Sequence, residues 1–129
     1  MHPPKWYRVL SLLAGELYDM PCNLVIISET EHLGILEEFL YLKAHTQKPI
    51  KVTCTGPLTM TMPIELGNVY KDRIELAAEV AHVINAELKA LVAAGAEFIQ
   101  IDEPSYAFLP GSMKEWVAVF NEAVDGVKA

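Results

Sequence analysis

Short apolar runs alternate with longer amphipathic segments along the chain. The runs at 24–28, 50–55 and 97–101 are rich in β-forming residues and follow turn or breaker residues, which is typical of buried strands. Segments long enough for helices lie between and after them. This order predicts parallel strands joined by crossover helices, and therefore an α/β fold.

The longest helix is predicted over 72–94. Asp72 with Glu75 opens it as a capping box, and Gly95 closes it. Its apolar residues recur at helical spacing, at Ala77, Val80, Ala81, Ile84, Leu88, Leu91 and Val92.

Three further segments are predicted to be helical. The segment 112–127 begins with a second capping box, Ser112 with Glu115, and carries an apolar face. The segment 31–45 has a weaker apolar side, formed by Leu33, Leu36, Phe39 and Leu40. The segment 5–19 has apolar residues at helical spacing but is interrupted by a glycine.

Charge and apolar content narrow the classes of function. The 129 residues carry 17 acidic against 10 basic side chains, a net charge of −7, and the basic residues are scattered singly. We therefore expect neither a nucleic-acid partner nor a membrane surface. No apolar run approaches the roughly 20 residues that span a bilayer, and the N-terminus lacks a secretory pattern, so a cytoplasmic location is expected.

In α/β folds, ligands bind beyond the carboxyl ends of the strands. Chemistry is therefore expected at 28–31, 54–63 and 102–108. In the first segment, Glu29 faces a ligand or Thr30 caps the next helix, and the capping role is favoured.

The second segment opens a long loop before the helix at Asp72. Its methionines either pad an apolar ligand or fill gaps in the packing, and packing is favoured.

The third segment brings a buried strand directly into Asp102 and Glu103, and Pro104 stops the strand. Strand alternation places Asp102 on the face of Gln100 and Glu103 on the opposite face. One acid therefore points toward a crevice or barrel interior and the other away from it. An acid at this place binds an amine, orients a histidine or metal ligand, acts as a general base, or caps a turn.

Cysteines and histidines show no metal-binding or redox spacing. Cys22 and Cys54 are far apart and are expected to be reduced thiols, with Cys54 buried in a strand. Surface or packing roles are favoured for all four histidines, which are His2, His32, His45 and His82.

The stretches KVTCTGPLTMT at 51–61 and YKDRIELAAEVAHVINAELKALVAAGAEFIQIDEPSYAF at 70–108 resemble the C-terminal catalytic barrel of the cobalamin-independent methionine synthase family. The anchors are Thr-Gly-Pro-Leu-Thr and Ile-Gln-Ile-Asp-Glu-Pro, separated by one loop and one long helix. The resemblance implies parallel βα units of a (β/α)8 TIM barrel, a fold shared with uroporphyrinogen decarboxylase and the coenzyme M methyltransferases.

The resemblance also implies a substrate site. In that family the aspartate of Asp-Glu-Pro contacts the amino group of homocysteine, which points to Asp102, with Glu103 as its neighbour. Thr55 and Gly56, at the other matching strand end, are further substrate-binding candidates. The implied activity is a zinc-dependent transfer of a methyl group to a small thiol or amino-acid substrate, with zinc binding the thiolate.

The sequence departs from the family pattern in two ways. The zinc motif His-x-Cys would begin beyond Ala129, so the chain contains none of the zinc ligands and is expected to be inactive alone. Pro63 stands where folate-using synthases have a tryptophan, and the lost stacking surface counts against a folate donor. Two alternatives stay open: a non-catalytic fragment or subunit that acts in assembly or small-ligand binding, and a coenzyme M-type thiol transferase.

We expect a single domain over 1–129, with a helical segment at 1–20 and three βα units over 21–129. Three units make an incomplete barrel with unpaired sheet edges. In order of preference, the rest of a longer polypeptide, self-association or a second subunit, or the N-terminal helix covers those edges.

Overall fold

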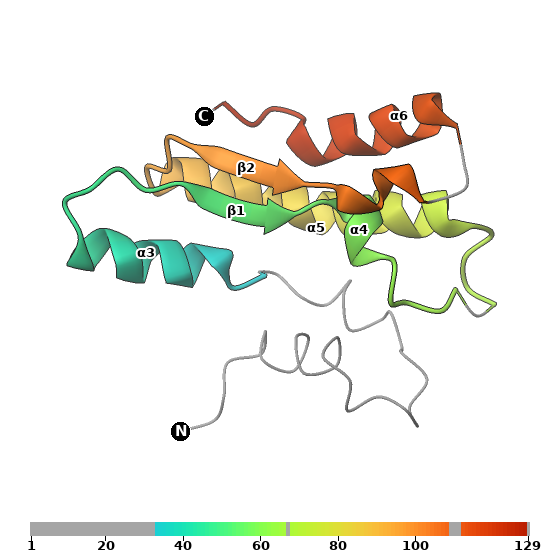
Figure 1. The fold of residues 1–129 in the computed structure, drawn as a ribbon, viewed down its shortest axis with the longest axis horizontal. Coiled ribbons are helices and arrows are strands. Elements are labelled where there is room, and N and C mark those ends of the chain that lie inside the picture. The colour runs from blue at the N-terminus through green and yellow to red at the C-terminus, as the bar shows by residue number, and fades with distance from the viewer. Residues whose placement is uncertain (1–32, 67, 109–111, 129) are drawn as a thin grey trace, which may run out of the picture.

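The computed structural model describes residues 33–66, 68–108 and 112–128. The elements follow in the order α3 (Ile35–His45), β1 (Val52–Thr55), α4 (Pro57–Met60), α5 (Arg73–Ala93), β2 (Ile99–Asp102), the 3-10 turn η1 (Pro104–Ala107) and α6 (Met113–Val124) (Figure 1). β1 and β2 are parallel, with Val52 opposite Ile99 and Thr55 opposite Asp102. The predicted α/β class with parallel strands is confirmed, whereas the segments 5–19 and 24–28 lie outside the described residues.

Several predicted boundaries were wrong by a few residues. The strands begin at Val52 and Ile99, and β2 extends to include Asp102. Within the described part of 31–45, the helix begins only at Ile35, after Gly34 in a left-handed conformation (φ 89°). Leu40, predicted on the apolar side of that helix, is 47% exposed.

The last helix ends at Val124 instead of 127 because a side chain from α5 closes it. Asn85 Nδ2 donates hydrogen bonds to the backbone oxygens of Ala123 (3.1 Å) and Asp125 (2.8 Å). The chain then turns away at Gly126, whose φ is 68°. A contact from another helix thus overrides the local apolar pattern.

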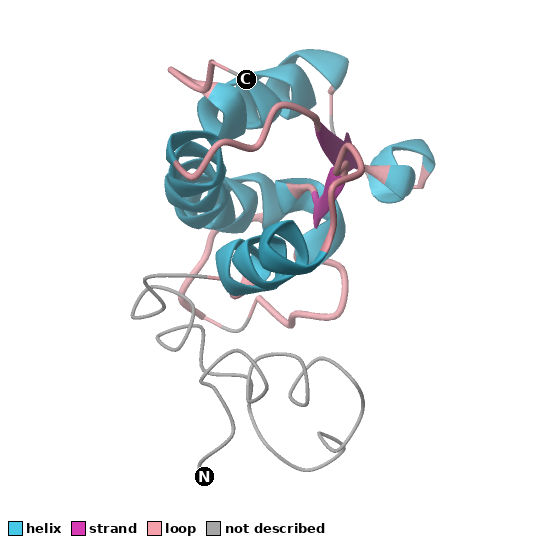
Figure 2. Cartoon of the chain, turned by 90° about the vertical axis from the view of Figure 1, so that its left-hand side faces the viewer, coloured by secondary structure: helices cyan, strands magenta, loops and turns pink. Residues whose placement is uncertain are grey.

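The long helices all lie on one side of the two strands (Figure 2). α5 runs behind β1 and β2, with α3 and α6 on either flank (Figure 1). Val52 and Cys54 point toward these helices and are buried, while Thr53 and Thr55 are exposed on the other face. The sheet therefore has one apolar, covered face and one polar, open face.

α5 is the centre of the core, and its predicted apolar stripe is confirmed except at Val92, which is only half-buried. Leu76, Ala77, Val80, Ala81, Ile84, Leu88 and Leu91 are buried on it. At its start the Asp72 side chain accepts a hydrogen bond from the Glu75 backbone (3.0 Å), but the Glu75 carboxylate bonds to Lys71 N. The predicted capping box is therefore half formed here, whereas both of its bonds are present at Ser112 and Glu115.

The segment between β1 and α5 is more ordered than the predicted loop. It begins with the single turn α4, and Arg73 then donates hydrogen bonds to the backbone oxygens of Thr61 and Ile64. Of the two methionines there, Met60 packs against the core and Met62 is 45% exposed. No helix in the described part of the chain is long and apolar enough to cross a membrane.

Candidate functional site

The carboxyl ends of β1 and β2 lie side by side at one end of the sheet, where α4 and η1 begin (Figure 1). Gly56 N donates a 2.8 Å hydrogen bond to the backbone oxygen of Asp102, which extends the pairing one residue past β1. The structure therefore brings together all four predicted site residues, Thr55, Gly56, Asp102 and Glu103. It gives the two acids different tasks.

The carboxylate of Glu103 is used to hold the start of α4. Its oxygens accept hydrogen bonds from the backbone nitrogens of Leu58 (2.9 Å) and Thr59 (2.9 Å) and from Thr59 Oγ1 (2.7 Å). Thr59 Oγ1 in turn accepts a bond from Ser105 N at 3.3 Å. These bonds lock the segment after β2 to the segment after β1, and Glu103 is half-buried among them.

Gly56 is required here by the close approach of Glu103. A Cβ atom at Gly56 would lie 2.3 Å from Cδ of Glu103, so the Glu103 side chain would have to move and give up its hydrogen bonds to α4. The backbone angle of Gly56 is ordinary (φ −75°), so space and not conformation demands the glycine. The Thr-Gly-Pro and Asp-Glu-Pro stretches therefore fit together as one unit.

Asp102 faces the open side of the sheet. It lies on the same face as Gln100, as strand alternation predicted, and Gln100 Nε2 donates a 2.7 Å hydrogen bond to Asp102 Oδ1. The side chain is exposed, as is that of Thr55 beside it. Asp102 is thus the acid of the pair that a ligand at this edge would meet.

Cys54 lies one residue before this edge, with its side chain turned into the core. It is 3% exposed, which confirms the predicted buried strand thiol. Burial first, and then the charges of Glu87, Asp102 and Glu103 in that order, together raise the pKa of Cys54 to about 12. The thiol is therefore protonated at neutral pH and serves as packing instead of as a nucleophile.

The described residues do not fit a metal ion. Across 33–66, 68–108 and 112–128, no group of three or more histidine, cysteine, aspartate and glutamate side chains is arranged to hold one. His45 stacks on Tyr41 with ring centroids 4.2 Å apart, and His82 is exposed on α5. The other two histidines and Cys22 lie outside the described residues.

Sequence reasoning missed a second structural carboxylate, that of Glu87. It is fully buried on α5 and accepts hydrogen bonds from the backbone nitrogens of Leu33 (3.0 Å) and Leu36 (2.8 Å), at the start of α3. The available signal was an acid at helical spacing between Ile84 and Leu91, inside the apolar stripe. A charge at such a position needs a partner, and here that partner is the helix start.

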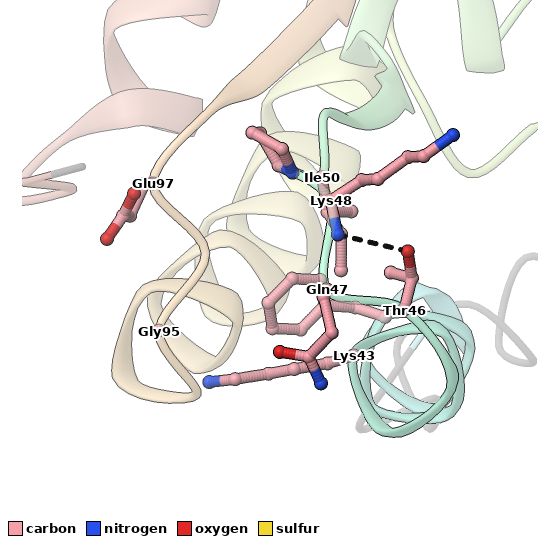
Figure 3. Close-up of a pocket in the computed structure, with 9 residues that line it drawn as sticks. Lys43, Thr46, Gln47, Lys48, Ile50, Gly95 and Glu97 are labelled. Atoms are coloured by element: carbon pink, nitrogen blue, oxygen red, sulfur yellow. Dashed lines mark hydrogen bonds between the residues drawn. The ribbon is translucent and has the colours of Figure 1, made fainter.

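A hollow of about 320 Å³ lies at the opposite end of the strands, between the ends of α3 and α5 (Figure 3). Lys43 crosses it and donates a 2.7 Å hydrogen bond to the backbone oxygen of Ala94, at the end of α5. Lys48 and Glu97 extend away in opposite directions (Figure 3). Because its charged groups do not converge, this hollow is not a candidate for the site.

Comparison with known proteins identifies relatives for most of the chain. The family model described as "Cobalamin-independent synthase, Catalytic domain" matches residues 25–129. A methionine synthase of Sulfurisphaera tokodaii is 32% identical over 127 residues, 95% of this chain and 36% of the relative. A methionine synthase of Thermococcus kodakarensis is 40% identical over 95 residues, 73% of this chain and 28% of the relative.

A third relative, a methionine synthase of Pyrococcus furiosus, is 37% identical over 101 residues, 78% of this chain and 30% of the relative. The chain thus spans about a third of the length of the curated relatives that it matches. The comparison with solved structures gave no significant match.

Proposed function

Because this chain belongs to the cobalamin-independent synthase catalytic-domain family, we propose that it forms the acceptor side of a methyl-transfer site. The acceptor is a small amino-acid thiol, and the name of the relatives, methionine synthase, supports homocysteine. The observation that carries the proposal is the exposed Asp102 carboxylate at the end of β2, beside Thr55 and Gly56 at the end of β1.

In this proposal Asp102 binds the ammonium group of the acceptor. An ionised carboxylate and an ammonium form a charge-assisted hydrogen bond, which orients the substrate without taking part in bond making. Glu103 does not share this task, since its carboxylate already accepts three hydrogen bonds from α4. Its contribution is to hold the two strand ends at a constant separation.

The resemblance implies zinc as the group that would activate the thiol, but the described residues do not fit it. The described residues therefore have no proposed role in binding zinc. We propose no methyl donor either, because Pro63 supplies no aromatic surface for a pterin to stack on.

We further propose that the βα units belong to a (β/α)8 barrel and that residues 1–129 form one partial domain of it. Support comes from the open polar face and from the outer edges of β1 and β2, which carry no other strand among the described residues. Further strands come from the rest of the barrel or from a second copy of the chain. The proposed location is the cytoplasm.

Binding to the purified chain tests the acceptor proposal. We expect L-homocysteine and L-methionine to shift the backbone amide resonances of the non-proline residues within 55–59 and 102–105, and Asp102→Asn to abolish these shifts. Glu97→Gln is the matched control, since Glu97 is an exposed acid before the same strand. If the wild-type chain shows no shifts with either amino acid, the acceptor site is disproved and a role in assembly is favoured.

A further inference from the structure

The open face of the sheet carries a line of hydrogen-bonded polar side chains that leads to Asp102. Gln100 and Asp102 lie on this face of β2, opposite Thr53 and Thr55 of β1. Lys51, just before β1, reaches across and donates a 2.9 Å hydrogen bond from Nζ to Gln100 Oε1. Gln100 Nε2 donates the next bond, 2.7 Å long, to Asp102 Oδ1.

The chemistry of the two neighbours decides how the Gln100 amide is turned. An ammonium has only donors, so Lys51 selects the amide oxygen. An ionised carboxylate has only acceptors, so Asp102 selects the amide nitrogen. If the amide were rotated by half a turn, its nitrogen would face the Lys51 ammonium, donor against donor, and its oxygen would face the Asp102 carboxylate, acceptor against acceptor. The line therefore has one direction, from Lys51 through Gln100 to Asp102.

This arrangement fixes the Asp102 carboxylate without neutralising it. Gln100 is uncharged, and within the described residues Asp102 forms no ion pair and no hydrogen bond through Oδ2. One oxygen is thus held in place, while the other and the net negative charge are available to a cation. A direct bond from Lys51 would have occupied the same carboxylate with a competing ammonium.

We infer that Gln100 is a positioning residue for Asp102, that Lys51 orients Gln100, and that together they make the site selective for an acceptor that carries an amino group. This inference rests on the proposed acceptor site. It adds that selectivity for the amine depends on a neutral side chain that does not touch the substrate.

The first test measures the line itself and needs no ligand. In the full chain, Asp102→Asn and Lys51→Met should each shift the side-chain amide resonances of Gln100. The side-chain amide of Gln47, exposed on the loop after α3, is the internal control, and Lys114→Met, at an exposed position of α6, is the control variant. If neither substitution moves the Gln100 signals beyond the control, the inference is wrong.

The second test separates positioning from a merely structural role. Gln100→Leu should weaken L-homocysteine binding by about fivefold, the usual effect of one lost hydrogen bond, and leave 4-mercaptobutyrate, which lacks the amino group, unaffected. Equal weakening of both ligands, or no change for homocysteine, overturns the inference but not the acceptor site. If the wild-type chain binds neither ligand, the acceptor site fails, and the inference fails with it.

Discussion

The start of α3 and the start of α4 are each held by a glutamate from a distant part of the chain. Glu87 holds α3 from within the core and is fully buried, whereas Glu103 holds α4 at the open end of the sheet and is half-buried. Both accept backbone N–H bonds at a helix start, where the unpaired donors favour a negative charge. The chemistry is the same, but the surroundings differ.

This difference separates stability from function. At Glu87 no solvent can replace the lost bonds, so the carboxylate mainly stabilises the fold. At Glu103 the same type of bond fixes the strand ends on which Asp102 stands, and the adjacent acid, Asp102, stays exposed where the acceptor is proposed to bind. Substitutions at Glu87 therefore test the stability of the core, and substitutions at Glu103 test the geometry of the candidate site.

The largest effect is expected from Glu87→Ala. Two charge-assisted hydrogen bonds and a filled volume are lost, so the free energy of unfolding should fall by about 4 kcal/mol. Urea titration followed by circular dichroism measures it. Glu79→Ala, at an exposed position of the same helix, should stay within about 0.5 kcal/mol. A loss at Glu87 no larger than at Glu79 would remove the distinction between the two regions.

Gly56→Ala should destabilise the site region by about 2 kcal/mol, because its Cβ would overlap the Glu103 side chain. In a Glu103→Ala background the same substitution should cost almost nothing, since the overlapping atoms are gone. The coupling free energy from this double-mutant cycle is the measurement. Additive losses would show that another contact demands the glycine.

Glu103→Gln should lower the free energy of unfolding by about 1.5 kcal/mol, since an amide cannot accept all three bonds. Asp102→Asn should change it by less than about 0.5 kcal/mol, because Asp102 is exposed and, among the described residues, its carboxylate is hydrogen-bonded by Gln100 alone. Glu97→Gln is again the control. If Asp102→Asn were the more damaging change, the assignment of one acid to the fold and the other to the ligand would be reversed.

Alkaline pH should lower the free energy of unfolding through Cys54, whose pKa is raised from 9.0 to about 12 by burial and by the neighbouring carboxylates. Below pH 9 the Cys54 thiol is protonated in both the folded and the unfolded chain, so its contribution to stability is complete there. Between pH 9 and 12 the unfolded chain loses the proton first, so stability falls, by about 1.4 kcal/mol at pH 10. Cys54→Ala should lack this part of the decline in urea titrations repeated at each pH.

The smallest expected effect is the difference between the shifts that Glu87 and Glu103 cause in the pKa of Cys54. The Glu87 charge raises the pKa of Cys54 more than the Glu103 charge does. Glu87→Gln should therefore lower the pKa of Cys54 more than Glu103→Gln does. The pH dependence of alkylation, in a Cys22→Ser background, measures both. The opposite order would mean that the charge of Glu103, at the candidate site, acts on the thiol more strongly than the charge of Glu87, in the core.

Much of the fold and part of the site could be predicted from the chain alone. Local signals predicted α5 and α6, the full capping box at Ser112, the parallel strands, and Asp102 on the face of Gln100. The parallel pairing follows from the order of strands and helices, and the other features depend on neighbours within one or two turns of helix or along a single strand. Short-range spacing is sufficient to encode them.

Only the tertiary structure decided which acid serves the fold. The bonds of Glu103 to α4 and of Glu87 to α3 join residues 44 to 54 positions apart, and the clash that demands Gly56 spans a similar separation. No local pattern contains such distances. The sequence by itself determined that two acids stand at the end of an apolar strand. The prediction that this strand is buried was wrong, since Ile99 and Ile101 are half-buried and Gln100 is exposed. Packing of β1 against β2 determined that Glu103 turns to the backbone and Asp102 to the open face, since only there could each find its partner.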